Sequence, residues 1–208
     1  MHTASPFADR PHAALARAVR ALNAGQVIVY PTETFYGLGV DISVRGALDR
    51  LYAIKAREFD KPVALIAANL EMAFSVAREV PPAARRLAEK FWPGPLTLVL
   101  PAVPGLPAEL VGPEGGVGIR VSSHRVARAL AAALGRPVTA TSANPAGAPP
   151  ARTIREARAF FENRVAVYLD GGTMSADAPS TIVAFEGSRM RILRAGAISQ
   201  ARLLENPK

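Results

Sequence analysis

The pattern of apolar and polar positions divides the chain into segments with helical spacing and short apolar runs typical of strands. Helical spacing predicts helices over residues 11–24, 45–56, 70–77, 82–91, 124–134 and 154–161. Short, largely β-branched runs predict strands over residues 26–31, 63–67, 96–100, 117–121, 138–141, 165–170, 180–185 and 189–194. Helices and strands alternate early, whereas strands dominate late. This order predicts an α/β protein with a twisted mixed sheet and packed helices, rather than a purely parallel doubly wound sheet.

Glycine, proline and hydroxyl residues mark the breaks between these elements. Gly25 ends the first predicted helix. Trp92-Pro93-Gly94-Pro95 is a forced turn, because two prolines and a glycine cannot continue a helix. Ser122 or Ser123 can cap the helix that follows. Residues 32–39, rich in hydroxyls and glycine, are predicted to form a loop.

The composition bounds the class of protein. At 208 residues, 50% of them apolar, the chain fits one large domain with a sizeable core. The absence of cysteine excludes disulfides, cysteine-ligated metals and thiol catalysis, and it suits a reducing cytoplasm. The first residues lack the apolar core of a secretory signal, and the longest apolar run, residues 63–68, is far shorter than the roughly 20 residues that span a bilayer. We therefore expect a cytoplasmic protein without a membrane segment.

The net charge of +8 comes mostly from arginine. A basic balance favours anionic partners such as nucleotides, tRNA or phosphates, but an Arg- and Ala-rich composition can also reflect genomic base content and solubility. No block of lysine and arginine with interleaved aromatic residues occurs, so charge alone does not establish nucleic-acid binding.

Two stretches place cations and small polar groups where predicted elements end. Lys55 and Arg57 can face one ligand if the second helix ends near Lys55; the alternative is a pair of cations that complement the helix C-terminus. Ser142-Ala143-Asn144 follows a threonine-rich strand end, where hydroxyl and amide groups bind phosphate or carboxylate oxygens, although the same residues also form ordinary turns. Together the two stretches can hold a polyanion such as a nucleotide triphosphate.

The stretch from Thr32 to Gly39 also follows a predicted buried strand, where ligand-binding loops of α/β folds tend to lie. Thr32 and Thr34 would share a face in an extended chain. Glu33 could serve as a base or a metal neighbour, but we expect a solvated carboxylate. His124 lies near a predicted helix start and is assigned no catalytic role.

Several common catalytic motifs are absent. The sequence has no G-x-x-x-x-G-K-[ST] phosphate loop, no G-x-G-x-x-G after a strand, no H-E-x-x-H zinc motif and no G-x-S-x-G elbow. Binding of ATP would therefore require a phosphate-binding site other than these common motifs.

A set of segments resembles the YrdC/Sua5 family of threonylcarbamoyl-AMP synthases, in the order of that family. These segments are VIVYPTETFYGLGVD (27–41), LYAIKAREFDKPVALI (51–66), FWPGPLTLVLPA (91–102), VGIRVSSH (117–124), VTATSANPAGAPP (138–150), PSTIVAF (179–185) and ILRAGAI (192–198). They run from near the start to near the end of the chain, and as a set they are highly specific.

The resemblance implies a twisted α/β sheet around a deep, basic cavity. It implies that residues 1–208 form the short single-domain type, without the C-terminal domain of the longer Sua5 type. The implied reaction converts L-threonine, bicarbonate and ATP into L-threonylcarbamoyladenylate and pyrophosphate. Other proteins then transfer the threonylcarbamoyl group to adenosine 37 of tRNAs that read ANN codons.

Carried over by position, the resemblance implies an ATP-binding set of Lys55, Arg57, Ser142, Asn144 and Arg194, of which Lys55 and Arg57 would neutralise the triphosphate during catalysis. It implies a threonine-binding set of Thr32, Arg120 and Ser180. Mg²⁺ is expected to arrive with ATP. Because the sequence shows no obvious magnesium carboxylate, phosphate oxygens would supply most of its ligands.

The sequence departs from the family pattern in two places. The family usually has proline after the arginine of its K-x-R motif, whereas Glu58 follows Arg57 here. A histidine found after this motif in some members is also absent, with residues 64–67 in that region. The Pro-Gly-Pro-Leu-Thr and Ser-Ala-Asn segments are intact, which favours the active branch of the family over a related branch without clear synthase activity.

Two other functions stay open from the sequence. A basic cavity could dock double-stranded RNA or tRNA during ribosome maturation, and steep salt dependence of RNA binding without threonine-dependent ATP consumption would favour that function. The other open function is that of a carbamoyl-transfer module resembling the YrdC-like domain of hydrogenase maturation proteins. That domain normally lies in a much longer chain with zinc-finger and acylphosphatase parts, and neither part occurs here.

Overall fold

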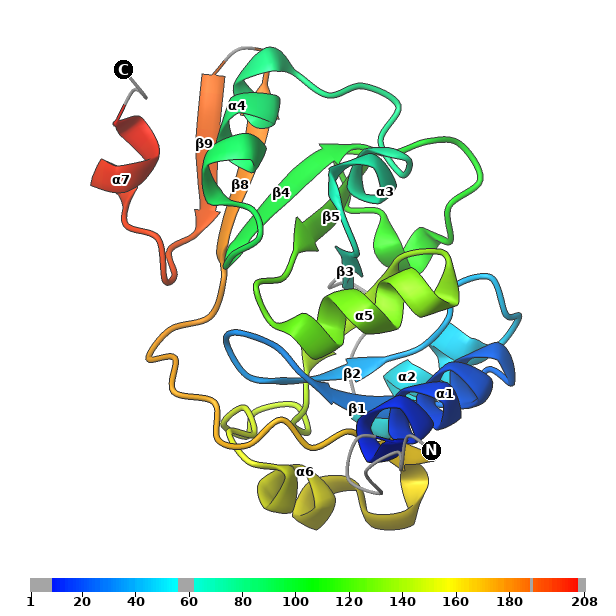
Figure 1. Ribbon diagram of the computed structural model, residues 1–208. Helices are drawn as coiled ribbons and strands as arrows, with labels where there is room; N and C mark the ends of the chain where they lie inside the picture. The colour runs from blue at the N-terminus through cyan, green and yellow to red at the C-terminus, as the bar shows by residue number, and fades with distance from the viewer. Residues whose placement is uncertain (1–8, 56–61, 188, 206–208) are drawn as a thin grey trace, which may run out of the picture.

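The computed structural model describes residues 9–55, 62–187 and 189–205. These residues form one twisted, mixed nine-stranded sheet with helices packed on it (Figure 1). The predicted fold class is therefore confirmed.

The helices fall on the predicted segments, except for one short helix near residue 200 that was not predicted. They are α1 (Asp9–Asn23), α2 (Ala47–Lys55), α3 (Leu70–Phe74), α4 (Pro82–Phe91), α5 (Arg125–Leu134), α6 (Ile154–Phe161) and α7 (Gln200–Leu204), with 3₁₀ turns η1 (Ala108–Leu110) and η2 (Glu162–Arg164). The strands are β1 (Ile28–Pro31), β2 (Tyr36–Gly39), β3 (Ala64–Ala67), β4 (Leu96–Pro101), β5 (Gly116–Val121), β6 (Val138–Ser142), β7 (Val167–Tyr168), β8 (Thr181–Glu186) and β9 (Arg189–Arg194).

The sheet has the strand order β7-β1-β2-β6-β3-β5-β4-β8-β9. The pairs β1/β7, β3/β5 and β4/β8 are parallel and the other pairs are antiparallel. β6 pairs with β2 on one side and β3 on the other, and so connects the lower half of the sheet in Figure 1 to the upper half. The last residue of β6, Ser142, belongs to the predicted Ser-Ala-Asn stretch. This strand order therefore places that stretch beside both halves.

Alternating side chains of β1 and β3 belong to two different hydrophobic cores. Ile28 and Tyr30 of β1 and Ile66 of β3 join the core formed with α1 and α5. Val29 and Leu65, one position along the same strands, join the core that includes α2 and α4. All five side chains are fully buried, and each of the four aliphatic ones contributes about 1.5–3 kcal/mol of hydrophobic stabilisation. In Figure 1, α1 and α5 lie side by side in front of the sheet.

The prediction of a loop throughout residues 32–39 is wrong, because Tyr36–Gly39 form β2 and pair with β1. Tyr36 and Leu38 are fully buried, while the alternate positions are glycines. A Cβ on Gly39 would lie 2.8 Å from Cε1 of Tyr30, so the glycine leaves room for that ring across the sheet.

The cap of α5 also differs from the prediction. Neither Ser122 nor Ser123 caps it; the N-cap is His124, whose Nδ1 accepts a hydrogen bond from Val126 N at 3.3 Å. Burial lowers the pKa of His124, and this favours the neutral ring that can accept the bond. Ser122 Oγ instead accepts from His124 N at 3.1 Å.

Other segments differ at their ends. The helix predicted over 70–77 ends at Phe74, and the strand predicted over 165–170 is confined to Val167 and Tyr168. The turn at Trp92–Pro95 is confirmed: it contains a cis Trp92–Pro93 bond, and Gly94 N donates to Val121 O. Among the described helices, none has both the length and the apolar character required to cross a bilayer.

Candidate functional site

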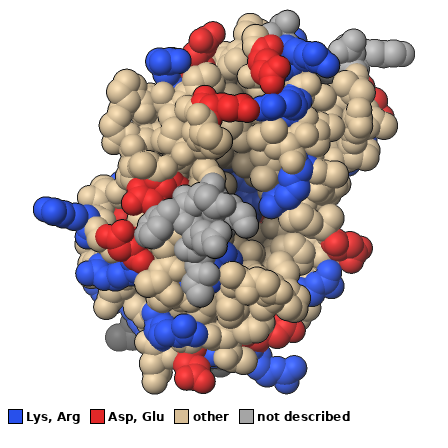
Figure 2. Space-filling model, turned by 180° about the vertical axis from the view of Figure 1, so that it is seen from behind, with Lys and Arg blue, Asp and Glu red and all other residues tan. Residues whose placement is uncertain are grey.

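A cavity of about 460 Å³ opens between the two halves of the sheet. Figure 2 shows this side of the molecule hollowed between an upper and a lower part, with basic side chains within and beside the hollow. The cavity is lined by Thr32, Thr34, Phe35, Tyr36, Gly37, Pro62, Val63, Ala64, Thr97, Arg120, Ala140, Thr141, Ser142, Pro150, Pro179, Ser180, Ile182 and Arg194.

The loop between β1 and β2 brings two threonine hydroxyls to one wall. Thr32 Oγ1 donates to Phe35 O at 2.6 Å and accepts from the backbone N–H groups of Thr34 and Phe35, which closes a tight turn. The hydroxyls of Thr32 and Thr34 lie 3.0 Å apart, and both residues are buried. The two hydroxyls therefore lie together on one side of a turn, whereas a shared face was expected only for an extended chain.

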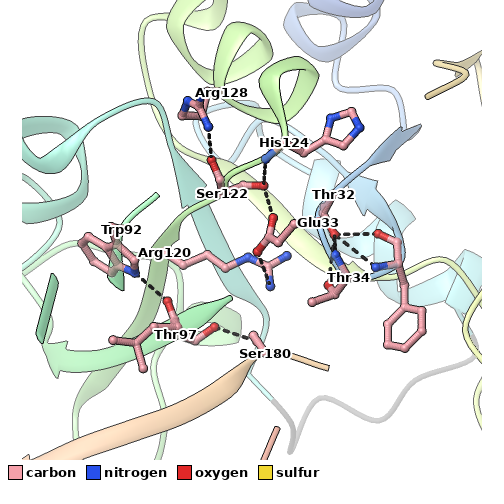
Figure 3. Close-up of polar contacts among 12 residues, drawn as sticks. Thr32, Glu33, Thr34, Trp92, Thr97, Arg120, Ser122, His124, Arg128 and Ser180 are labelled. Carbon is pink, nitrogen blue, oxygen red and sulfur yellow. Dashed lines mark hydrogen bonds and ion pairs between the residues drawn. The ribbon is translucent and has the colours of Figure 1, made fainter. Parts of the chain in front are cut away.

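Arg120 lies near the end of β5 with its side chain only 9% exposed. Its Nη1 lies 3.5 Å from Glu33 Oε1, and Ser122 Oγ donates to Glu33 Oε2 (Figure 3). The expectation of a solvated Glu33 is wrong: its side chain is 11% exposed and faces a buried cation. The turn that directs its two threonine neighbours to the cavity directs Glu33 to Arg120.

Ser180 and Arg194 form the opposite corner of the cavity. Ser180 Oγ lies 2.9 Å from Thr97 Oγ1, and the Arg194 guanidinium donates to Ser180 O at 2.8 Å and to Ser180 Oγ at 3.0 Å. The pKa of Arg194 is lowered, mainly because burial desolvates its guanidinium and to a smaller extent because the positive charge of Arg120 repels it. Two guanidinium groups that repel each other across a cavity favour an anion between them.

Lys55, at the end of α2, holds the Ser-Ala-Asn stretch. Its Nζ donates to Ser142 O at 2.6 Å and Asn144 O at 3.0 Å, and it lies 3.3 Å from both Ser142 Oγ and Asn144 Oδ1. Asn144 Nδ2 donates back to Pro145 O at 3.0 Å and Ala148 O at 2.6 Å. Lys55 and Asn144 are buried behind Ser142, which itself lines the cavity.

The predicted site residues are thus brought to one region wherever the structure describes them. Thr32, Arg120, Ser142, Ser180 and Arg194 line the cavity, and Lys55 and Asn144 support its wall. Arg57, like Glu58, lies outside the described residues.

Thr97 is a wall residue that was not among the predicted site residues. Thr97 is 3% exposed, and its hydroxyl contacts Ser180 inside the cavity. The available signal was a hydroxyl residue within the otherwise apolar strand Leu96–Pro101.

The described residues contain no group of three or more His, Cys, Asp and Glu side chains that could hold a metal ion. An all-protein metal cage is therefore not built from this part of the chain. A metal ion that enters with a polyphosphate would take most of its ligands from phosphate oxygens and water.

Residues 20–196 match the family model described as telomere recombination, the Sua5/YciO/YrdC family. This chain belongs to that family. The match covers the whole of the cavity wall, from the loop after β1 to Arg194 at the end of β9.

Relatives in this family include proteins named threonylcarbamoyl-AMP synthase. The chain is 39% identical to one from Vibrio cholerae, with 88% of this chain and 97% of the relative covered. It is 38% identical to a putative threonylcarbamoyl-AMP synthase from Mycobacterium tuberculosis, with 90% and 86% covered.

A solved structure extends the comparison to three dimensions. The chain superposes on Pyrococcus abyssi Sua5 in complex with L-threonine with a TM-score of 0.83 and 32% identity. That superposition covers 88% of this chain and 54% of the other, so this chain spans about half the length of the Pyrococcus protein.

Proposed function

We propose that this chain is an L-threonylcarbamoyladenylate synthase, a nucleotidyltransferase that makes threonylcarbamoyl-AMP and pyrophosphate from L-threonine, bicarbonate and ATP. The observation that carries this proposal is the convergence of Arg120, Arg194 and several hydroxyls on one cavity, bordered by a loop that Lys55 holds in place. Membership of the family and the names of the relatives support the same activity.

We assign the amino-acid end of the cavity to Arg120 and its neighbours. A planar guanidinium binds a carboxylate through two parallel hydrogen bonds, so Arg120 suits the threonine carboxylate. Thr32 and Ser180 present hydroxyls on opposite walls, where they can bond the polar groups of threonine.

We assign the nucleotide to the wall formed by Ser142 and its loop, and to Arg194, which adjoins the threonine end at Ser180. Ser142, Asn144 and Arg194 would contact the nucleotide, with Lys55 and Arg57 supplying positive charge for the triphosphate. In the structure, Lys55 donates to carbonyl oxygens of the Ser142–Asn144 stretch. Lys55 would therefore hold this stretch in place as well as supply charge. Mg²⁺ is expected to enter bound to the phosphates of ATP.

The chemistry proceeds in two bond-forming steps. The amine of threonine adds to the carbon of bicarbonate and water leaves, which gives the N-carboxylate. An oxygen of this carboxylate then attacks the α-phosphorus of ATP in line, and the bond to the pyrophosphate oxygen breaks. Catalysis would come mainly from positioning and from cations that stabilise charge on the phosphoryl oxygens, because the cavity is not required to supply a nucleophile.

The product suits a downstream transfer. A mixed anhydride of a carbamate and AMP is an activated acyl donor, so separate proteins would pass the threonylcarbamoyl group to tRNA. We propose a cytoplasmic location, where ATP and tRNA are both available.

Pyrophosphate release tests the proposal. Purified protein is incubated with MgATP and bicarbonate, with and without L-threonine, and with L-serine as a control. We expect release that depends on both threonine and bicarbonate. Release that is equal with and without threonine, or no release at all, would refute the proposed function.

A further inference from the structure

Glu33 occupies an unusual position in the loop between β1 and β2. The hydroxyls of its neighbours Thr32 and Thr34 line the cavity, whereas the Glu33 carboxylate lies beside Arg120 and outside the cavity wall. Its side chain is nonetheless largely buried. A carboxylate in such a place requires a structural reason, because burying a charge is costly unless it is paired.

One carboxylate oxygen of Glu33 accepts a hydrogen bond from Ser122, and the other faces Arg120 without a hydrogen bond. Ser122 Oγ donates to Oε2, while Oε1 faces Arg120 Nη1 at 3.5 Å, too far for a well-formed hydrogen bond (Figure 3). Within the described residues, Glu33 Oε1 and Arg120 Nε are the buried side-chain polar atoms without a hydrogen-bond partner. The carboxylate therefore attracts the guanidinium from one side without using its hydrogen-bond donors.

Ser122 fixes the carboxylate in turn. It follows directly on β5, its carbonyl accepts from Arg128 Nη1 at 2.6 Å, and its Oγ accepts from the backbone of the residue that caps α5. The position of Glu33 is thus tied to the start of α5 and to the strand that carries Arg120.

We propose that Glu33 is a positioning residue for the amino-acid carboxylate: it holds the Arg120 guanidinium from behind, so that the free donors of Arg120 are presented to a monocarboxylate in the cavity. The inference rests on the proposed function, since it assumes that Arg120 receives threonine. Glu33 also offsets one of the two guanidinium charges of Arg120 and Arg194, leaving one net positive charge among these three side chains.

Because of this charge, the binding of a zwitterion and of a polyanion should respond differently to a change at Glu33, and this difference distinguishes a positioning role from a merely structural one. Glu33→Gln keeps the shape of the side chain and raises the local charge by one unit. Threonine is a zwitterion at neutral pH, so the added charge helps it little, while the loss of Arg120 alignment weakens its carboxylate contact. A polyanion such as pyrophosphate, in contrast, gains from the added positive charge.

Calorimetric titration of threonine and of pyrophosphate, each alone, tests the inference. For Glu33→Gln we expect the threonine Kd to rise about tenfold, as for the weakening of one charged hydrogen bond, and the pyrophosphate Kd to fall several-fold. Glu156→Gln, which alters an exposed carboxylate in the capping box of α6, is the matched control and should change neither Kd.

A second variant covers the case in which Glu33→Gln does not fold. Ser122→Ala removes the hydroxyl that holds Glu33 but leaves every charge in place. Threonine binding should weaken several-fold while pyrophosphate affinity stays unchanged.

The outcomes separate the inference from the function on which it rests. If the unmodified protein binds no threonine, the proposed function fails and the inference with it. If the unmodified protein binds threonine and both variants bind it equally well, Glu33 does not position Arg120 and only the inference fails. Equal weakening of threonine and pyrophosphate binding in Glu33→Gln would show a structural role and would also overturn the inference.

Discussion

Lys55 shows how a single buried charge can organise this site. It is 5% exposed, and its ammonium contacts the backbone and side-chain oxygens of Ser142 and Asn144. Such a group is stable in the interior because its donors are directed at oxygen atoms. It connects the end of α2 to the end of β6, and thereby fixes one edge of the cavity.

Lys55→Met should remove these hydrogen bonds while keeping the apolar stem of the side chain. We expect the free energy of unfolding to fall by about 1–3 kcal/mol, because the carbonyls of Ser142 and Asn144 lose a charged donor, and we expect most synthase turnover to be lost. Urea denaturation and pyrophosphate release measure the two effects. Lys90→Met, which removes a more exposed lysine that also donates to carbonyls, is the control and should cost less than about 1 kcal/mol. Unchanged stability of Lys55→Met would contradict this account of the wall.

Individual site residues differ in how far the sequence could predict them. Thr32 and Ser142 lie at strand ends, where a local pattern is enough to suggest a binding loop. Thr97 could not be found in this way, because its partner Ser180 is 83 positions away and meets it only through the pairing of β4 with β8. The contact of Glu33 with Arg120 likewise depends on the strand order of the sheet.

At the scale of elements, Asp41 joins the segment after β2 to the turn between α5 and β6. Its side chain is fully buried; Arg136 Nε donates to both of its oxygens, and Arg136 Nη2 also contacts Oδ2. Burial by itself would raise the pKa of Asp41, but the hydrogen bonds from Arg136 and Ser43 outweigh it and lower the pKa from 3.8. The ionised form is therefore the one that stabilises the fold.

Asp41→Asn should reveal this contribution through its pH dependence. Because the folded-state pKa lies below the unfolded value, the stabilisation is fully present above the unfolded pKa and is lost as the pH falls through the folded-state pKa. We expect a loss of about 2 kcal/mol at neutral pH, and convergence of the two proteins as acidification protonates Asp41 in the parent. Urea midpoints measured from neutral pH down to about pH 3 check the prediction. A difference that stays constant over this range would exclude an ionic contribution.

Gly196, just after β9, tests how closely the elements around Ser180 and Arg194 are packed. A Cβ at this position would overlap the carbonyl oxygen of Pro179 and lie 2.6 Å from Ser180 C and Thr181 N. Gly196→Ala should therefore displace Ser180, destabilise the protein by about 1–3 kcal/mol and raise the KM for threonine. Gly112→Ala, where the added Cβ meets only ordinary contacts at 3.6 and 3.7 Å, is the control. A normal KM in Gly196→Ala would argue against a role for Ser180 in threonine binding.

Elements with strong local signals match the sequence prediction, and those with weak signals do not. α4, α6 and β9 have the predicted bounds, because apolar periodicity, a proline start or a capping box defines them locally. β2 was missed because Gly37 and Gly39 alternate with Tyr36 and Leu38, and glycines in a short run are typical of a turn. Only pairing with β1 and β6 makes this segment a strand.

For the whole molecule, the central feature is one cavity between two halves of a continuous sheet. The strand order brings the loop after β1, the ends of β5 and β6, the start of β8 and the end of β9 to its walls. Residues as far apart in the sequence as Thr32 and Arg194 thus line the same cavity. Cations and hydroxyls around this cavity, together with the loop that Lys55 holds, suit a polyanion bound beside a molecule that carries a carboxylate.

The most direct test of the account is the identity of the product. The protein is incubated with MgATP, L-threonine and ¹³C-labelled bicarbonate, and the nucleotide products are separated and analysed by mass spectrometry. We expect threonylcarbamoyl-AMP that carries the label, formed together with pyrophosphate and absent when threonine is omitted. Formation of an unlabelled threonyl adenylate, or no threonine-dependent nucleotide product, would contradict it.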